Sequence, residues 1–162
     1  MQDTENVVAD WLRLEQAPGV GRRSAGRLLR QFGSPAGIFN AGYAALAEHV
    51  SPAQARALCE PMSPATARLL DATLSWLSFP SHHLLTLHDA GYPHLLANIA
   101  DPPLLLYIKG RIDLLARPAL AIVGSRNASA QGKANAEAFA RALSAAGLVI
   151  VSGLALGIDA AA

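Results

Sequence analysis

Residues 119–159 decide the fold; they read ALAIVGSRNASAQGKANAEAFARALSAAGLVIVSGLALGID. Two short apolar runs, Ala119–Val123 and Leu148–Val151, are typical of buried strands, and the segment Ser129–Ala146 between them has the composition and length of a helix. A strand, a helix and a second strand in so short a span form a βαβ unit, whose strands lie parallel. The sequence therefore predicts an α/β fold built on a parallel sheet.

Local signals mark the ends of this helix and the face that it buries. Ser129 is expected to be its N-cap, and Gly147 stands where the first residue after a helix adopts a left-handed conformation. The apolar stripe expected to face the sheet consists of Phe139, Ala142, Leu143 and Ala146.

Each predicted strand is followed by a glycine loop. Gly124, Ser125 and Arg126 follow the first strand, and Ser152 and Gly153 follow the second. Open α/β sheets bind ligands at this carboxyl edge, where backbone N–H groups hold phosphate and arginine donates a bidentate pair of hydrogen bonds. The spacing fits neither a dinucleotide fingerprint nor a P-loop. The sequence favours one anion-binding groove, although glycine turns that serve only packing would produce the same pattern.

The chain changes character near Phe79-Pro80. Before that point we expect only helices, with serine-proline pairs as starting signals: Val7–Gln16, Arg22–Phe32, Ser34–Ala41, Tyr43–His49, Ser51–Cys59 and Ser63–Leu77. After it, Leu84–Leu87 and Leu104–Ile108 are short apolar runs between glycine and proline turns, which indicates strands. The sequence thus predicts a helical domain at 1–79 and a sheet domain at 80–162.

A second candidate contact lies in the helical part. Pro18-Gly19-Val20-Gly21 separates two predicted helices, and Arg22 and Arg23 follow at once. This resembles a helix-hairpin-helix motif, in which hairpin amides and nearby bases hold a nucleic-acid phosphate without reading sequence. A hairpin used only for packing remains the alternative.

Composition narrows the class of protein. The 162 residues are 52% hydrophobic and 15% charged with a formal net charge of +1, which excludes a disordered chain. No apolar run reaches the roughly 18 residues of a membrane span, the N-terminus lacks a basic signal-peptide region, and one cysteine excludes a disulfide framework. A cytoplasmic protein is the expectation. The bases cluster in two stretches: Arg22, Arg23, Arg27 and Arg30, then Lys109, Arg111, Arg117, Arg126 and Lys133.

The sequence lacks the motifs that are typical of catalytic and metal-binding sites. The five histidines have no metal-ligand spacing, and no nucleophile elbow occurs among the serines. Cys59 is expected to be a small core residue, and Asp159 is the single acid in the predicted groove. We therefore predict no catalytic residue, no metal and no cofactor.

The order of motifs resembles the DprA/Smf family of DNA-processing proteins over nearly the whole chain. The resemblance rests on Pro18-Gly19-Val20-Gly21, Tyr92-Pro93-x-x-Leu96, Asp101-Pro102-Pro103, Leu106–Gly110, Val123-Gly124-Ser125-Arg126-x-x-Ser129-x-x-Gly132 and Ser152-Gly153-Leu154-Ala155-x-Gly157-Ile158-Asp159. It implies a SAM-like helical domain followed by the first part of an extended Rossmann-like domain, whose remainder would follow residue 162. Leu156 stands where the family commonly has arginine.

The resemblance implies a non-enzymatic recombination mediator of natural transformation. Family members bind single-stranded DNA, load the RecA recombinase and act as dimers. By resemblance, Gly124, Ser125, Arg126, Ser152 and Gly153 are the DNA-binding residues, and Gly19, Gly21, Arg22, Arg23 and Lys133 are secondary contacts. Two alternatives stay open: a nucleotide-hydrolysing enzyme, whose Pro-Gly-Gly-x-Gly-Thr stretch this chain lacks, and a module that docks a partner protein.

Overall fold

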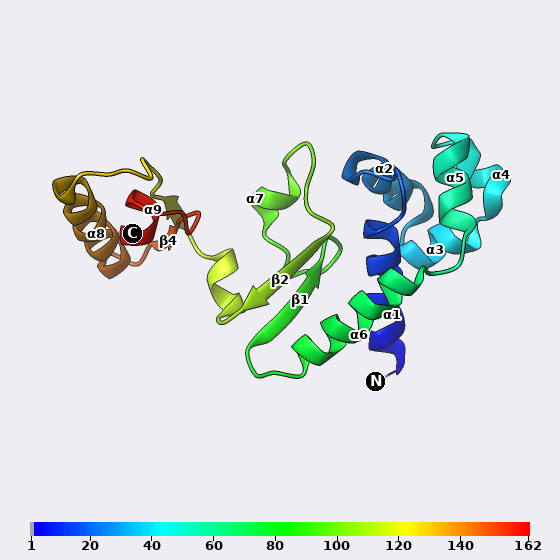
Figure 1. Ribbon diagram of the computed structural model, residues 1–162, viewed down its shortest axis with the longest axis horizontal. Helices are drawn as coiled ribbons and strands as arrows, with labels where there is room; N and C mark the ends of the chain where they lie inside the picture. Colours follow the sequence, from blue (N-terminus) through cyan, green and yellow to red (C-terminus); the bar gives the residue numbers. More distant parts are fainter. Residues whose placement is uncertain (1) are drawn as a thin grey trace. The chain divides into compact units, whose positions relative to one another are not determined.

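The computed structural model describes residues 2–162, which divide into two compact units, one that ends at Ile112 and one that spans Asp113–Ala162. Figure 1 shows the elements of the first unit in blue to green and those of the second in yellow to red.

The first unit begins with six helices and contains no strand among its described residues before His82. The helices are α1 (Gln2–Glu15), α2 (Arg22–Phe32), α3 (Pro35–Asn40), α4 (Gly42–Ala47), α5 (Pro52–Cys59) and α6 (Pro64–Leu77). The serine caps are confirmed: Ser51 Oγ accepts from Gln54 N at 3.3 Å, and Ser63 Oγ accepts from Thr66 N at 3.1 Å. α1 starts earlier than the predicted Val7 because Asp3 and Glu5 stabilise its first turn.

An antiparallel hairpin completes this unit. Strands β1 (His82–Thr86) and β2 (Leu105–Lys109) pair from His82 opposite Lys109 to Thr86 opposite Leu105. The long connection between them contains the short helix α7 (His94–Ala97), which the sequence analysis did not predict. Tyr92 anchors this connection, because its buried hydroxyl donates to the Pro103 carbonyl at 2.8 Å.

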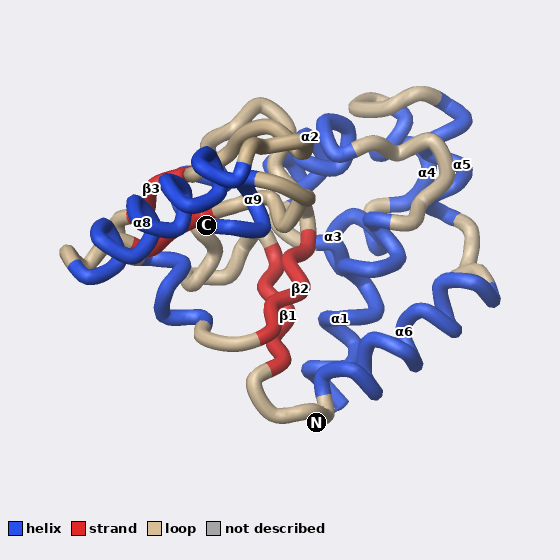
Figure 2. The backbone as a smooth tube through the Cα atoms, turned by 60° about the vertical axis from the view of Figure 1, so that its left-hand side comes forward, coloured by secondary structure: helices blue, strands red, loops and turns tan. Residues whose placement is uncertain are grey.

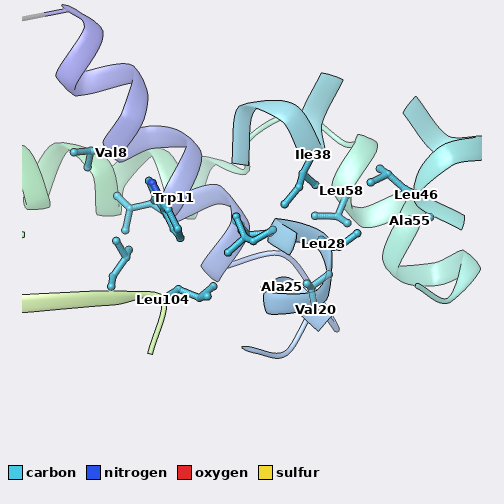
Figure 3. Packing of buried hydrophobic residues seen from close by; sticks show 14 residues of the cluster. Val8, Trp11, Val20, Ala25, Leu28, Ile38, Leu46, Ala55, Leu58 and Leu104 are labelled. Atoms are coloured by element: carbon cyan, nitrogen blue, oxygen red, sulfur yellow. The ribbon is translucent and has the colours of Figure 1, made fainter. Parts of the chain in front are cut away.

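The hydrophobic core of the first unit includes residues of both the helices and the hairpin segment. Leu12, Leu28 and Ile38 are fully buried, and Leu104 joins them from the segment that leads into β2 (Figure 3). Secondary structure therefore changes where the sequence predicted, between Leu77 and His82, whereas the compact unit continues to Ile112. The assignment of two domains at 1–79 and 80–162 stays a prediction.

The second unit contains the predicted βαβ arrangement. After a short 3-10 helix, η1 (Ile112–Ala116), come β3 (Ala119–Ala121), α8 (Ala130–Ala145), β4 (Val149–Val151) and α9 (Ile158–Ala161). β3 and β4 are parallel, with Ala119 opposite Val149 and Ala121 opposite Val151. Figure 2 shows α8 running beside β3. The chain is thus a mixed α/β structure with two small sheets, and its SAM-like and Rossmann-like character stay predictions.

Three burial predictions are wrong. The predicted buried strand β3 is exposed and β4 is at most half-buried, because the sheet of this unit has two strands and α8 packs against β4. On α8 the inward face consists of Ala136, Ala140 and half-buried Leu143, while Phe139 is 65% exposed. The face is rotated because alanines let the helix approach the sheet closely, which a phenylalanine would prevent. Cys59 is exposed since Ala55 and Leu58 take the buried face of α5.

Candidate functional site

The two glycine loops of the second unit lie side by side. Backbone pairing of β3 and β4 continues past the strand, since Ile122 N donates to Val151 O at 3.0 Å. The Ser152 hydroxyl then joins the loops, with its oxygen 2.9 Å from the Ile122 carbonyl and 3.1 Å from that of Asp159. The structure therefore brings the two predicted glycine loops together at the carboxyl edge of the sheet.

The carboxylate of Asp159 bridges both loops through two hydrogen bonds, which we call the Asp159 clasp. Its Oδ1 accepts from Gly124 N at 3.1 Å, and its Oδ2 accepts from Gly153 N at 3.2 Å. These are the two glycine amides that the sequence analysis intended for a phosphate. In this structure an internal carboxylate holds them, because Asp159, in the first turn of α9, reaches back over both loops. Asp159 is the single acid of the predicted groove, and nothing in the sequence pattern predicts that it binds the loop amides.

Close packing explains the glycines of this region. A Cβ at Gly124 would lie 2.7 Å from Ile158 Cγ1, and one at Gly153 would lie 2.9 Å from Asp159 Oδ2. Gly157 has φ +87°, and a Cβ there would overlap the carbonyl oxygen of Ser125. That same carbonyl accepts from Ile158 N at 3.1 Å. The glycines thus let α9 seat against the first loop, whatever ligand the loops hold.

Arg126 remains available to a ligand. Its side chain is exposed and makes no hydrogen bond or ion pair with any residue of the described range 2–162. The backbone N–H groups of Ser125 and Arg126 likewise donate to no described residue, whereas Ser125 Oγ accepts from Asn127 N at 3.1 Å. A guanidinium beside free amides can chelate one phosphate.

The helix after this loop carries the secondary residue Lys133. Ser129 caps α8 as predicted, because its Oγ accepts from Gly132 N at 3.1 Å. Lys133 is exposed in the first turn, next to this cap. The positive end of the helix dipole and this ammonium both favour an anion near the start of α8.

The other secondary contacts lie in the first unit, on the α1–α2 hairpin. Gly19 has φ +74°, which the turn requires, and its carbonyl accepts from Gln54 Nε2 at 2.7 Å. Gly21 is the N-cap of α2, and Arg22 and Arg23 begin that helix with exposed side chains. The hairpin is therefore ordered by a contact from α5 and presents two cations.

Neither unit offers a metal centre among residues 2–162, because no group of three or more histidine, cysteine, aspartate or glutamate side chains is placed to hold an ion. The same range contains no helix with the length and hydropathy that crossing a membrane requires.

Comparison with known proteins gives consistent matches. The family model described as DNA recombination-mediator protein A matches residues 83–162. DNA processing protein DprA of Streptococcus pneumoniae is 49% identical over 94 residues, which are 57% of this chain and 32% of that protein. Protein Smf of Escherichia coli is 38% identical over 93 residues, 57% of this chain and 25% of that protein.

A solved structure matches nearly the whole chain. The X-ray structure of DprA from Streptococcus pneumoniae has a TM-score of 0.64 and 31% sequence identity, and the match covers 92% of this chain and 50% of that one. The aligned parts therefore span a third or less of these curated relatives and half of the solved chain. The match includes the helices as well as the βαβ unit, because it extends well beyond residues 83–162.

Proposed function

This chain belongs to the DprA/Smf family by a partial-length match, and from that premise we propose that it mediates DNA recombination by binding single-stranded DNA. The proposal includes the cytoplasm as its location, a homodimer as its assembly and RecA as the recombinase that it loads during natural transformation. It assigns no catalytic residue, since family members are recombination mediators.

The observation that carries the proposal is Arg126. It projects from the first loop at the carboxyl edge of a parallel sheet, the edge at which such sheets bind ligands. Its guanidinium and the amides of Ser125 and Arg126 form a phosphate-binding group that no described residue occupies. Binding there releases counterions, so the affinity falls as salt rises.

The roles of the other loop residues follow from the clasp. Gly124 and Gly153 shape the groove while their amides hold Asp159, and Ser152 ties the two loops together. In this proposal they position the backbone beside the DNA, and Arg126 provides the charge. Lys133 then adds a second, weaker contact to the next phosphate.

The test is the substitution Arg126→Ala, with binding of a fluorescent dT oligomer measured by anisotropy at several salt concentrations. Loss of one charge-assisted contact costs about 1.5–3 kcal/mol, or roughly ten- to a hundredfold in affinity. The slope of log affinity against log salt should decrease by about 0.7, the value for one phosphate on a single strand. Arg126→Lys should restore part of the affinity, because lysine supplies charge without the bidentate fork.

The matched control is Arg141→Ala. Arg141 is another exposed arginine of the same unit, engaged with Glu137 at 2.6 Å within α8. Its removal changes net charge equally and should leave both the affinity and the slope nearly unchanged. Equal effects of the two alanine variants, with intact circular dichroism, would mean that Arg126 holds no phosphate.

A further inference from the structure

A basic cleft lies within the first unit, away from the glycine loops in the sequence. It has a volume of about 640 Å³ and opens between α2 and the connection that follows β1. Figure 1 shows α7 and its flanking loops facing α2. The lining residues are Arg22, Arg23, Gly26, Arg27, Leu29 and Arg30 on one wall, and Leu87, His88, Ala97, Ile99, Ala100 and Pro102 on the other.

The α2 wall carries four cations and no acid. Arg23, Arg27 and Arg30 follow helical spacing, so they lie on one face. None of these three makes a hydrogen bond or an ion pair with a residue in the described range. Arg22 differs, because its positive charge offsets a small part of the rise that burial causes in the pKa of Glu15. Three unpaired guanidinium groups on one helix face repel one another, and an anion in the cleft would relieve that repulsion.

Gly26 is a second and independent sign of a ligand. It lies in the interior of α2, where glycine is less favourable than alanine, and its backbone needs no positive φ. A Cβ there would meet only Arg30 Nη1, at an ordinary 3.8 Å. Neither the backbone conformation nor the packing of the described residues requires this glycine. Its effect is to leave the cleft wall bare beneath the Arg30 guanidinium.

The opposite wall is mostly apolar. Leu87, Ile99 and Pro102 line it, and Ile99 is 49% exposed. His88 stands at this wall with its ring edge-on to buried Trp11, the centroids 5.3 Å apart. A flat unpaired base can pack on such an apolar surface while its phosphate faces the arginines across the cleft.

We propose that this α2 cleft binds a segment of single-stranded nucleic acid, with phosphates on Arg23, Arg27 and Arg30 and a base against the Leu87–Pro102 wall. Gly26 lets the strand approach the helix backbone. The choice of a nucleic-acid strand rests on the proposed function, while the anion site itself rests on the cleft. The cleft thus forms a second contact region, distinct from Arg126.

The first test is the double substitution Arg27→Ala/Arg30→Ala in the 162-residue chain, with dT-oligomer binding measured against salt. The expected result is an affinity at least about tenfold lower and a salt slope smaller by about 1.4, for two lost phosphate contacts. The control is Arg56→Ala/Arg68→Ala, which removes two exposed arginines of α5 and α6 with the same charge change. Equal effects of the two double variants would overturn the proposal.

The second test uses Gly26→Ala, for which stability and binding should change in opposite directions. Alanine strengthens the helix, so the melting temperature should rise by a few degrees, yet the oligomer should bind more weakly because a methyl group now covers the wall. Unfolding cannot explain that combination. Unchanged affinity in the more stable variant would contradict the proposed close approach.

The outcomes separate this cleft from the groove at Arg126. If Arg126→Ala is neutral while the Arg27/Arg30 variant weakens binding, the cleft stands and the proposed function loses its assigned groove. If Arg126→Ala weakens binding while the Arg27/Arg30 variant does not, the proposed cleft site is refuted and the groove at Arg126 is supported. Competition by dTMP distinguishes the ligand: a mononucleotide that displaces the oligomer at equal molar concentration would identify a nucleotide pocket and overturn the strand assignment.

Discussion

The clasp at Asp159 makes a quantitative prediction for Asp159→Asn. The carboxylate accepts from two amides, but an asparagine of the same shape has one accepting oxygen, and its NH₂ group would face the second N–H. One charge-assisted hydrogen bond is therefore lost and the other becomes neutral. Both glycines are exposed, so water can replace part of the lost hydrogen bonding. We therefore expect the substitution to cost about 2 kcal/mol, near the low end of the range for hydrogen bonds to a charged group. Local opening should become about 30-fold more frequent.

Amide hydrogen exchange followed by NMR tests this directly. Gly124 and Gly153 should exchange faster in Asp159→Asn, one of them strongly, while the amides of β4 keep their rates. The control is Glu137→Gln, which removes a carboxylate whose partner is Arg141 on the solvent face of α8. Unchanged exchange at both glycines in the Asp159 variant would refute the clasp.

Two further predictions concern stability. Gly157→Ala places a Cβ 2.6 Å from the Arg126 carbonyl oxygen, at a residue whose φ is +87°. The resulting strain of about 1–3 kcal/mol should remove the exchange protection of the Ile158 amide. Protection equal to that of the wild type would contradict the close packing at Gly157. For Glu15, burial raises the pKa above its ordinary 4.5 against smaller opposing effects of Gln16 and Arg22. Between pH 4.5 and the raised pKa, the folded state binds more protons than the unfolded state does. The free energy of unfolding therefore falls as the pH rises through that range. Glu15→Gln should accordingly raise the melting temperature at pH 7, and its advantage over wild type should shrink toward pH 4; a constant difference would contradict the shift.

Elements with local signals could be predicted from the sequence. The bounds of α2, and the starts of α5 and α6 at Ser51 and Ser63, depend on caps and stops within a few residues. The βαβ unit has the same local character, because Gly124 and Gly147 end its strand and helix patterns. Propensity and capping are enough where neighbours in sequence decide the structure.

Features that depend on distant residues were not predicted. The role of Asp159 requires knowing that α9 folds back over the loop after β3. The inward face of α8 depends on the space between helix and sheet, which Ala136 and Ala140 fill although Phe139 is more hydrophobic. The α2 cleft needs a second wall, supplied by residues 87–102, which no pattern in Arg22–Arg30 can show.

The place of Leu104 in the first core has a consequence for how the chain folds. During synthesis α1 and α2 emerge long before Leu104, so the helices first form around an apolar face that is still incomplete. Completion requires closing a long stretch of chain, and such non-local contacts form slowly compared with helices. The rate at which the first unit reaches its native state is therefore expected to depend on the arrival of the β1–β2 hairpin, and until then Trp11 and its neighbours offer a transient apolar surface to chaperones.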